Sequence, residues 1–181
     1  MATPLQQKQV GLFSKSLHWL LALLMIGLLA LGWVMVQLDY FNPYYDSAPA
    51  LHYSLGILVF FLVLIKIIWQ LAKPLPAHDD RLKKYELYAS KIVHFILLIF
   101  MIMMPVSGYL VITAGTNDAS FFGLFNLPTL FKISNPVRDA ATFFHTYFPF
   151  ILVGFIIVHI LAALKHKFID KMKTARDMWP K

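Results

Sequence analysis

The sequence predicts an all-α membrane protein, a four-helix transmembrane bundle with both termini cytoplasmic. Of its 181 residues, 59% are hydrophobic and 14% are charged, whereas a soluble domain carries about 25% charged residues. Four separate apolar runs each reach the roughly 20 residues that a helix needs to cross a bilayer. This composition excludes a soluble enzyme, a disordered tail and a fibrous protein, and the length favours a single membrane domain over residues 1–181.

The apolar runs predict helices at about 16–37, 51–72, 88–114 and 142–165. The first run is too long for a signal peptide, and no small-residue cleavage site follows it. Between the last two helices, residues 115–141 are expected to form a surface loop with room for a short surface helix. That loop contains Gly123, Pro128 and Pro136, which interrupt regular structure.

Basic residues are distributed unequally among the connections. The N-terminal segment, the loop after the second helix and the C-terminal tail are rich in lysine and arginine, whereas the loops at about 37–50 and 115–142 hold only Lys132 and Arg138. Basic residues mark the cytoplasmic side, so both termini are predicted to be cytoplasmic. The formal net charge of +7 then favours anionic membrane lipid, not nucleic acid, as the partner.

The absence of cysteine leaves histidine as the main candidate metal ligand. Iron–sulfur clusters, thiolate zinc sites and covalent C-x-x-C-H haem attachment are excluded. A histidine inside a membrane helix is a functional hypothesis, because a polar ring in hydrocarbon needs a partner. For any single ring, the alternative is a hydrogen bond to a neighbouring backbone carbonyl.

The spacing of four histidines predicts two pairs. His145 and His159 are 14 residues apart, which places them on one helix face about 21 Å apart along the axis. His18 opens the first helix and falls at the cytoplasmic level of His159. His52 opens the second and falls at the periplasmic level of His145. Two His–His pairs stacked across the bilayer follow from topology and spacing.

Such pairs suit six-coordinate haem iron, which takes an imidazole on each side. A structural zinc ion needs four ligands, and only two histidines lie at the periplasmic level. Copper would lack its usual Cys or Met ligand. Two axial imidazoles also leave no open iron position, which favours electron transfer over oxygen binding. We therefore predict two non-covalent b-type haems.

Three small or basic residues share the ligand faces. Lys66 follows His52 by 14 residues, so it lies on the same face at the cytoplasmic level. There it would neutralise a haem propionate or, alternatively, extend to the headgroups. Gly32 and Gly56 would let a flat macrocycle approach the backbone, or would serve ordinary helix packing.

The remaining histidines have weaker assignments. His94 shares the cytoplasmic level and is an alternative ligand to His18 or His159. We prefer His159, because only the 145/159 pair explains two haems on one helix face. His94 would then be a hydrogen-bond donor to a propionate or quinone, or an interfacial ring. His78 and His166 are expected to be solvated.

Several short motifs, in order, resemble the bacterial cytochrome b561 family of four-helix, di-haem, quinone-linked cytochromes. They are Leu17-His18-Trp19, Leu51-His52 with Gly56, Pro105-Val106-Ser107-Gly108-Tyr109, and His145 and His159 with Ala162-Ala163-Leu164-Lys165-His166. The resemblance covers nearly the whole chain and implies that His18, His52, His145 and His159 are the axial ligands. The family often has arginine where this chain has Lys66, which preserves the charge but not the bidentate geometry.

The resemblance implies an inner-membrane di-haem b cytochrome of bacteria that carries electrons between a periplasmic donor and the quinone pool, with ubiquinone as the expected quinone. Some members are similar to superoxide oxidases, and a sister branch resembles an electron carrier with a periplasmic partner protein. One alternative is a cytochrome b subunit that anchors a dehydrogenase such as a hydrogenase. Another is a histidine-bearing structural or metal-transport protein without haem.

Overall fold

The computed structural model describes residues 10–74, 82–113, 119–130, 132–172 and 178–179. Its elements are α1 (Leu12–Met35), α2 (Ser47–Ala72), α3 (Lys84–Thr113), β1 (Ala119–Phe121), β2 (Phe125–Leu127), α4 (Asn135–Leu164) and a π-helix, η1 (Lys165–Ile169). Within these ranges, four helices are long and apolar enough to cross a membrane, with η1 continuing the last of them. The predicted four-helix membrane architecture is confirmed.

Each of the four helices begins before the position that the sequence predicted. The largest difference is in α4, which starts at Asn135 and not at about 142. Pro136 lies in its first turn, where a missing N–H interrupts no intrahelical hydrogen bond. The apolar run marks only the part of a helix that crosses lipid, whereas the helix continues into the polar residues beyond it.

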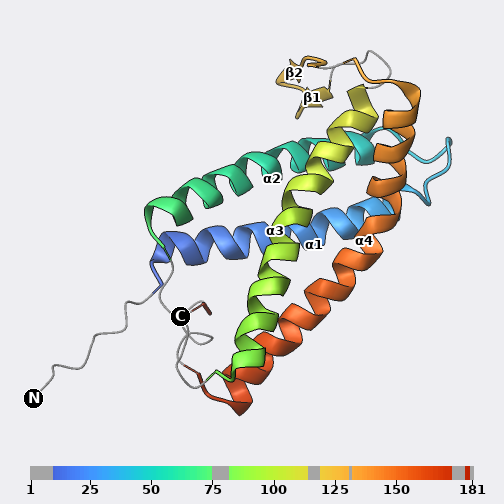
Figure 1. Ribbon diagram of the computed structural model, residues 1–181. Coiled ribbons are helices and arrows are strands. Elements are labelled where there is room, and N and C mark those ends of the chain that lie inside the picture. Colours follow the sequence, from blue (N-terminus) through green and yellow to red (C-terminus); the bar gives the residue numbers. More distant parts are fainter. Residues whose placement is uncertain (1–9, 75–81, 114–118, 131, 173–177, 180–181) are drawn as a thin grey trace, which may run out of the picture.

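The helices form two antiparallel pairs, α1 with α2 and α3 with α4, which are inclined to each other (Figure 1). Their shared core lies near the middle of the helices, where Leu21, Val59, Val63 and Leu152 are almost fully buried. Phe100 of α3 extends this core with ring contacts to α4. The core therefore separates the two ends of the bundle, where the polar side chains lie.

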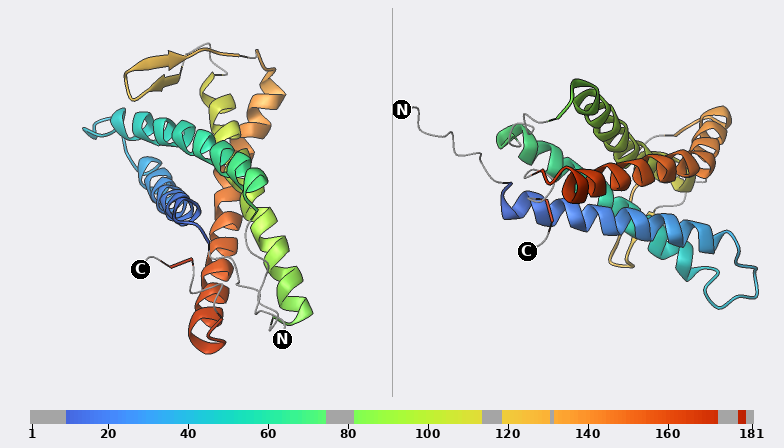
Figure 2. Two further views of the ribbon diagram at one scale, coloured as in Figure 1. Left: turned by 90° about the vertical axis from the view of Figure 1, so that its left-hand side faces the viewer. Right: turned by 90° about the horizontal axis from the view of Figure 1, so that it is seen from below.

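A β-hairpin covers one end of the bundle, at the ends of α2 and α3 (Figure 2). β1 and β2 pair antiparallel with Phe121 opposite Phe125, and Phe122 and Gly123 take positive φ values of 50° and 70° in the turn. Positive φ at both central residues is typical of the tight turns that join antiparallel strands. The described part of the 115–141 loop thus contains a hairpin in place of the expected surface helix.

Two hydroxyl groups attach this segment to the helices. Ser54 Oγ of α2 accepts a hydrogen bond from Phe122 N at 3.0 Å and donates one to Ala50 O at 2.8 Å. Tyr109 Oη of α3 accepts from Leu130 N at 3.0 Å and donates to Pro128 O at 2.6 Å. Each hydroxyl satisfies a loop backbone group that has no ladder partner.

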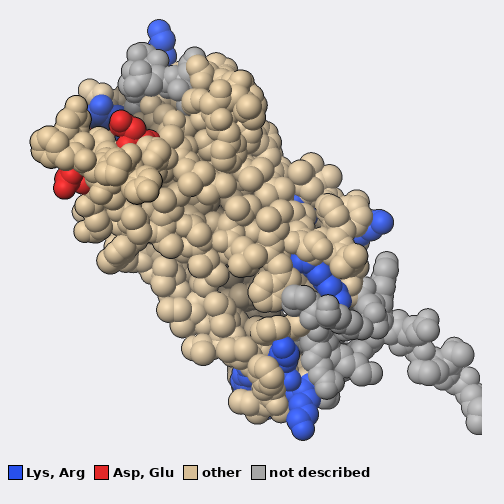
Figure 3. Space-filling view, turned by 180° about the vertical axis from the view of Figure 1, so that it is seen from behind, with Lys and Arg blue, Asp and Glu red and all other residues tan. Residues whose placement is uncertain are grey.

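Charged side chains gather at the two ends of the molecule, and an uncharged zone lies between them (Figure 3). Lysines cluster at the end opposite the hairpin, which we call the basic end; acidic residues gather at the hairpin end. Leu23, Ile68 and Phe95 illustrate the intervening zone, since each residue is about two thirds exposed, at 66%, 66% and 64%. In a four-span membrane protein such exposed apolar residues contact lipid.

Candidate functional site

Two histidine rings lie close together at the hairpin end, with their planes nearly perpendicular. His52 comes from the first turns of α2 and His145 from α4, and their ring centroids are 6.0 Å apart with ring planes at 83°. Both side chains are half-buried. A metal ion bound on opposite sides by two imidazole nitrogens at about 2.0 Å separates the ring centroids by about 6.3 Å. The spacing of this hairpin-end pair therefore suits an ion between the rings.

A second pair lies at the basic end. His18 of α1 and His159 of α4 have ring centroids 6.3 Å apart and planes at 66°. Each pair thus joins α4 to one helix of the α1–α2 pair, as the spacing in the sequence predicted. The structure brings together all four residues in the predicted combinations, while their role as ligands stays a prediction.

His94 also reaches the basic end, from the first half of α3. Its ring centroid is 5.1 Å from that of His159, and its Nδ1 lies 3.3 Å from Ser90 Oγ. A separation of 5.1 Å is too short for two rings on opposite sides of one metal ion, which need about 6.3 Å. The geometry therefore favours His18 over His94 as the partner of His159.

The rings of the hairpin-end pair differ in their hydrogen bonding. His145 Nδ1 lies 3.1 Å from Met104 O and 3.0 Å from Ser107 Oγ. His52 Nδ1 is buried and has no hydrogen-bond partner among the described residues. Histidine ligands usually have their second nitrogen held by such a carbonyl or hydroxyl, so His145 has the surroundings of an oriented ligand.

Two glycines allow the rings of this pair to lie against neighbouring helices. A Cβ atom on Gly108 of α3 would stand 2.9 Å from His145 Cε1, and one on Gly32 of α1 would stand 3.2 Å from His52 Cε1. At Gly56 an added Cβ would meet open space. Gly32, noted in the sequence as room for a macrocycle, is thus approached by an imidazole ring instead. The two glycines let the rings lie directly against the neighbouring helices, and the open space at Gly56, one turn beyond His52, leaves room beside the ring. Both features are compatible with a haem between the two rings.

Lys66 lies at the basic end, as predicted. It is half-buried in α2 and close enough to His18 to interact electrostatically with it. A lysine on this face can supply positive charge to an anionic group at the pair, which is the chemistry that haem propionates require.

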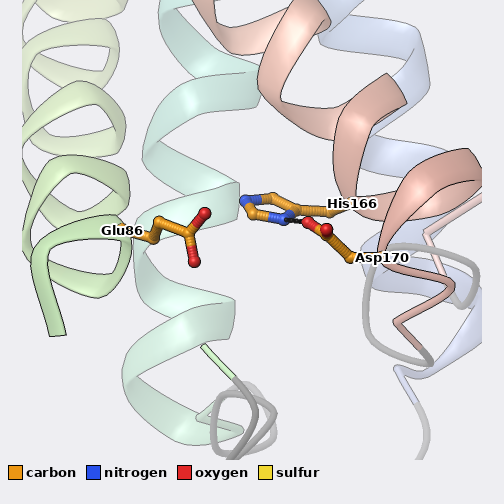
Figure 4. Close-up of side chains that lie close together, drawn as sticks. All are labelled: Glu86, His166 and Asp170. Carbon is orange, nitrogen blue, oxygen red and sulfur yellow. Dashed lines mark hydrogen bonds and ion pairs between the residues drawn. The ribbon is translucent and has the colours of Figure 1, made fainter. Parts of the chain in front are cut away.

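His166 was expected to be solvated, but the structure places it in an ion-pair network. Its Nδ1 lies 2.7 Å from Asp170 Oδ2, and its side chain is 18% exposed. Glu86 of α3 approaches the same group (Figure 4). Lys165 Nζ bonds Glu86 Oε1 at 2.7 Å and Asp170 Oδ2 at 2.8 Å.

The same network has the outline of a cation site, since three ligand atoms of Glu86, His166 and Asp170 lie within 4.8 Å of one another. The Lys165 ammonium already supplies the positive charge, and its hydrogen bond, with that of His166, lowers the pKa of the Asp170 carboxyl. The network ties the start of α3 to the end of α4, and no metal is needed to explain it. His78, the other histidine expected to be solvated, lies outside the described residues.

Sequence reasoning found the four paired rings but not the groups that hold His145. In the sequence, Ser107 and Gly108 stand only as members of the motif Pro105-Val106-Ser107-Gly108-Tyr109, and no motif includes Met104. Their contacts with His145 depend on how α3 packs against α4. Pro105, which directly follows Met104, was the only local signal in that part of α3.

The fold and these two sites define a class of protein: a helical membrane protein whose opposed histidine pairs have the spacing of bis-imidazole haem sites. The prokaryotic cytochrome b561 family model matches residues 9–181. The chain therefore belongs to the prokaryotic cytochrome b561 family. It is a multi-pass membrane cytochrome, and family membership implies that it binds haem b and transfers electrons.

Two relatives match almost end to end. The chain is similar to cytochrome b561 homolog 2 of Escherichia coli strain K12, with 33% identity over 171 residues that cover 94% of this chain and 91% of the relative. It is also similar to the probable superoxide oxidase CybB of Yersinia pestis, with 25% identity over 176 residues that cover 96% of this chain and 97% of the relative.

Proposed function

We propose that this protein is a di-haem b cytochrome of the bacterial inner membrane that passes electrons between a periplasmic donor and the quinone pool. The observation that carries this proposal is the pair of ring separations, 6.0 Å and 6.3 Å, at opposite ends of α4. His52 and His145 would hold one haem, and His18 and His159 the other. When bound, each haem supplies a one-electron couple of its iron.

The residues of the chain have defined tasks in this proposal. The four rings would hold the two haems, two rings to each, and a haem held by two imidazoles would supply electron transfer and not oxygen binding. Lys66 supplies positive charge at the basic end, and the Phe100, Phe148 and Phe155 rings fill the space between the two ends and exclude water. The clustering of lysine at the basic end supports a topology in which that end, and both termini, would face the cytoplasm.

The proposal is tested by purifying the protein in detergent and measuring its haem content and absorption spectrum. We expect a red protein with two haems per chain that is reduced by a quinol analogue without any other subunit. A red protein that reacts only with added soluble subunits would favour a dehydrogenase anchor. A colourless protein would contradict the proposal.

Superoxide is the donor that the Yersinia pestis relative suggests. Because superoxide is an anion, its capture would depend on positive charge at the hairpin end. Lys132 is exposed there. Arg138 is paired with Asp139 at 3.1 Å, which reduces its effect.

Replacing Lys132 and Arg138 together by Glu should slow haem reduction by superoxide severalfold, with a penalty that shrinks as salt rises. Stopped-flow absorbance measures these rates. The matched control is Lys84→Glu at the basic end, more than one Debye length of about 10 Å away at 0.1 M salt. The control variant should be reduced by superoxide at the unaltered rate, and reduction of the double variant by a neutral quinol analogue should also be unaffected. Equal losses of rate with both donors would remove superoxide from the proposal.

A further inference from the structure

The hydrogen bonds around His145 determine which of its nitrogens carries the proton. Met104 O is a carbonyl oxygen and can only accept, and it lies 3.1 Å from His145 Nδ1. The Nδ1 atom must therefore be the protonated nitrogen, which leaves the Nε2 lone pair free to bind a metal.

Ser107 strengthens this arrangement. Its hydroxyl donates to Met104 O at 2.9 Å, so its oxygen is left to accept from His145 Nδ1 at 3.0 Å. One N–H is thus shared between two acceptors. Ser107 is 4% exposed and Met104 8% exposed, so water does not compete for these bonds.

The other three rings lack this support in the described part of the chain. His52 Nδ1 is buried without a partner. His18 and His159 make ring contacts at the basic end, but neither ring has a nitrogen with two hydrogen-bond acceptors among the described residues. What the basic end has in their place is Lys66, a half-buried lysine of α2 that lies 14 residues after His52, on the same helix face.

Acceptors on the N–H of an imidazole ligand and a nearby cation have opposite effects on a bound iron. Acceptors make the imidazole a more basic donor, which stabilises the oxidised, more positive iron and lowers its reduction potential. A nearby cation disfavours the oxidised iron, which raises the potential.

We propose that Ser107 and the Met104 carbonyl are a positioning device that lowers the reduction potential of the hairpin-end haem, while Lys66 raises that of the basic-end haem. The two together make electron flow downhill from the hairpin end to the basic end. This inference rests on the proposed di-haem function and adds a direction to it.

The first test measures the reduction potentials of the unaltered protein. Potentiometry of the purified protein, followed by absorbance, should give two midpoint potentials, the lower of which belongs to the hairpin-end haem. The assignment comes from single-haem proteins lacking His145 or His159. The opposite order would overturn the inference while leaving the di-haem function intact, whereas a protein without two haems would contradict the function itself.

The second test uses Ser107→Ala. Loss of one acceptor should raise the hairpin-end potential, leave the basic-end potential unchanged, and alter only the hairpin-end EPR signal of the oxidised protein, because the His145 ring is then oriented only by its bond to Met104 O. Ser107→Thr keeps the acceptor oxygen and should restore both the hairpin-end potential and the hairpin-end EPR signal. An unshifted or lowered hairpin-end potential in Ser107→Ala with full haem content would contradict the role of Ser107.

The third test concerns the basic end. Lys66→Gln should lower the basic-end potential, and Lys66→Arg, which keeps the charge, should restore it. The hairpin-end potential serves as the internal control. A basic-end potential that does not respond to Lys66→Gln would limit the inference to the Ser107 arm and would remove Lys66 from it.

Discussion

His145→Ala and His159→Ala should each remove one of the two haems, and the two single-haem proteins should have distinct spectra. Both rings project from α4, but they lie at opposite ends of the bundle, 6.0 Å and 6.3 Å from their partners His52 and His18. The haem-to-protein ratio should fall from two to one in each variant, and the reduced absorption band should show which haem is left.

The partner variants show whether the pairs are correct. His52→Ala should have the spectrum of His145→Ala, and His18→Ala that of His159→Ala. The matched control is His94→Ala, which should keep two haems because its ring stands only 5.1 Å from His159. If His94→Ala removed the basic-end haem and His18→Ala kept it, the ligand pairing at the basic end would be wrong.

Gly108→Ala should produce the second large effect, the selective loss or weakening of the hairpin-end haem. The new methyl group would stand 2.9 Å from His145 Cε1, closer than carbon atoms approach without repulsion. The ring is also held by Met104 and Ser107 and cannot move aside without losing both hydrogen bonds. Gly32→Ala, at 3.2 Å from His52 Cε1, should act in the same direction but more weakly.

Gly27→Ala is the control, because an added Cβ there meets nothing within 4 Å. Alanine forms helix better than glycine by about 1 kcal/mol, so this variant should be neutral or slightly more stable to heat. Haem retention during gel filtration and the thermal unfolding temperature measure both effects. A Gly108→Ala protein that retains two haems with unchanged spectra would show that the hairpin-end site does not need this close approach.

The sequence predicted those parts of the site that depend on a single rigid helix. The placement of His145 and His159 on one face follows from helix geometry alone, and opposite chain directions bring His18 and His52 to the two levels. The start of α4 was missed, because hydropathy reports the lipid-crossing part of a helix and not its first turns. The β-hairpin was missed because its turn depends on a positive φ at Phe122, a residue with no tendency to adopt one.

Contacts between helices distant in sequence were also beyond prediction. Ser107 lies 38 residues from His145, and nothing in the spacing of either residue indicates that they touch. Likewise, the approach of Glu86 to Lys165, which spans 79 residues, depends on how the ends of α3 and α4 align. The bonds that define the tautomer of His145 therefore emerge only from the packed structure.

One helix, α4, carries a histidine of each pair. Because His145 and His159 belong to the same continuous helix, their separation is set by the backbone of α4. Tilting of the α1–α2 pair against α3 and α4 leaves this separation unchanged, and only a deformation of α4 itself alters it, most easily at Pro149, where one intrahelical hydrogen bond is missing. A single helix that carries one histidine of each pair therefore ties the distance between the two sites to its own length, and not to the thickness of the membrane around it.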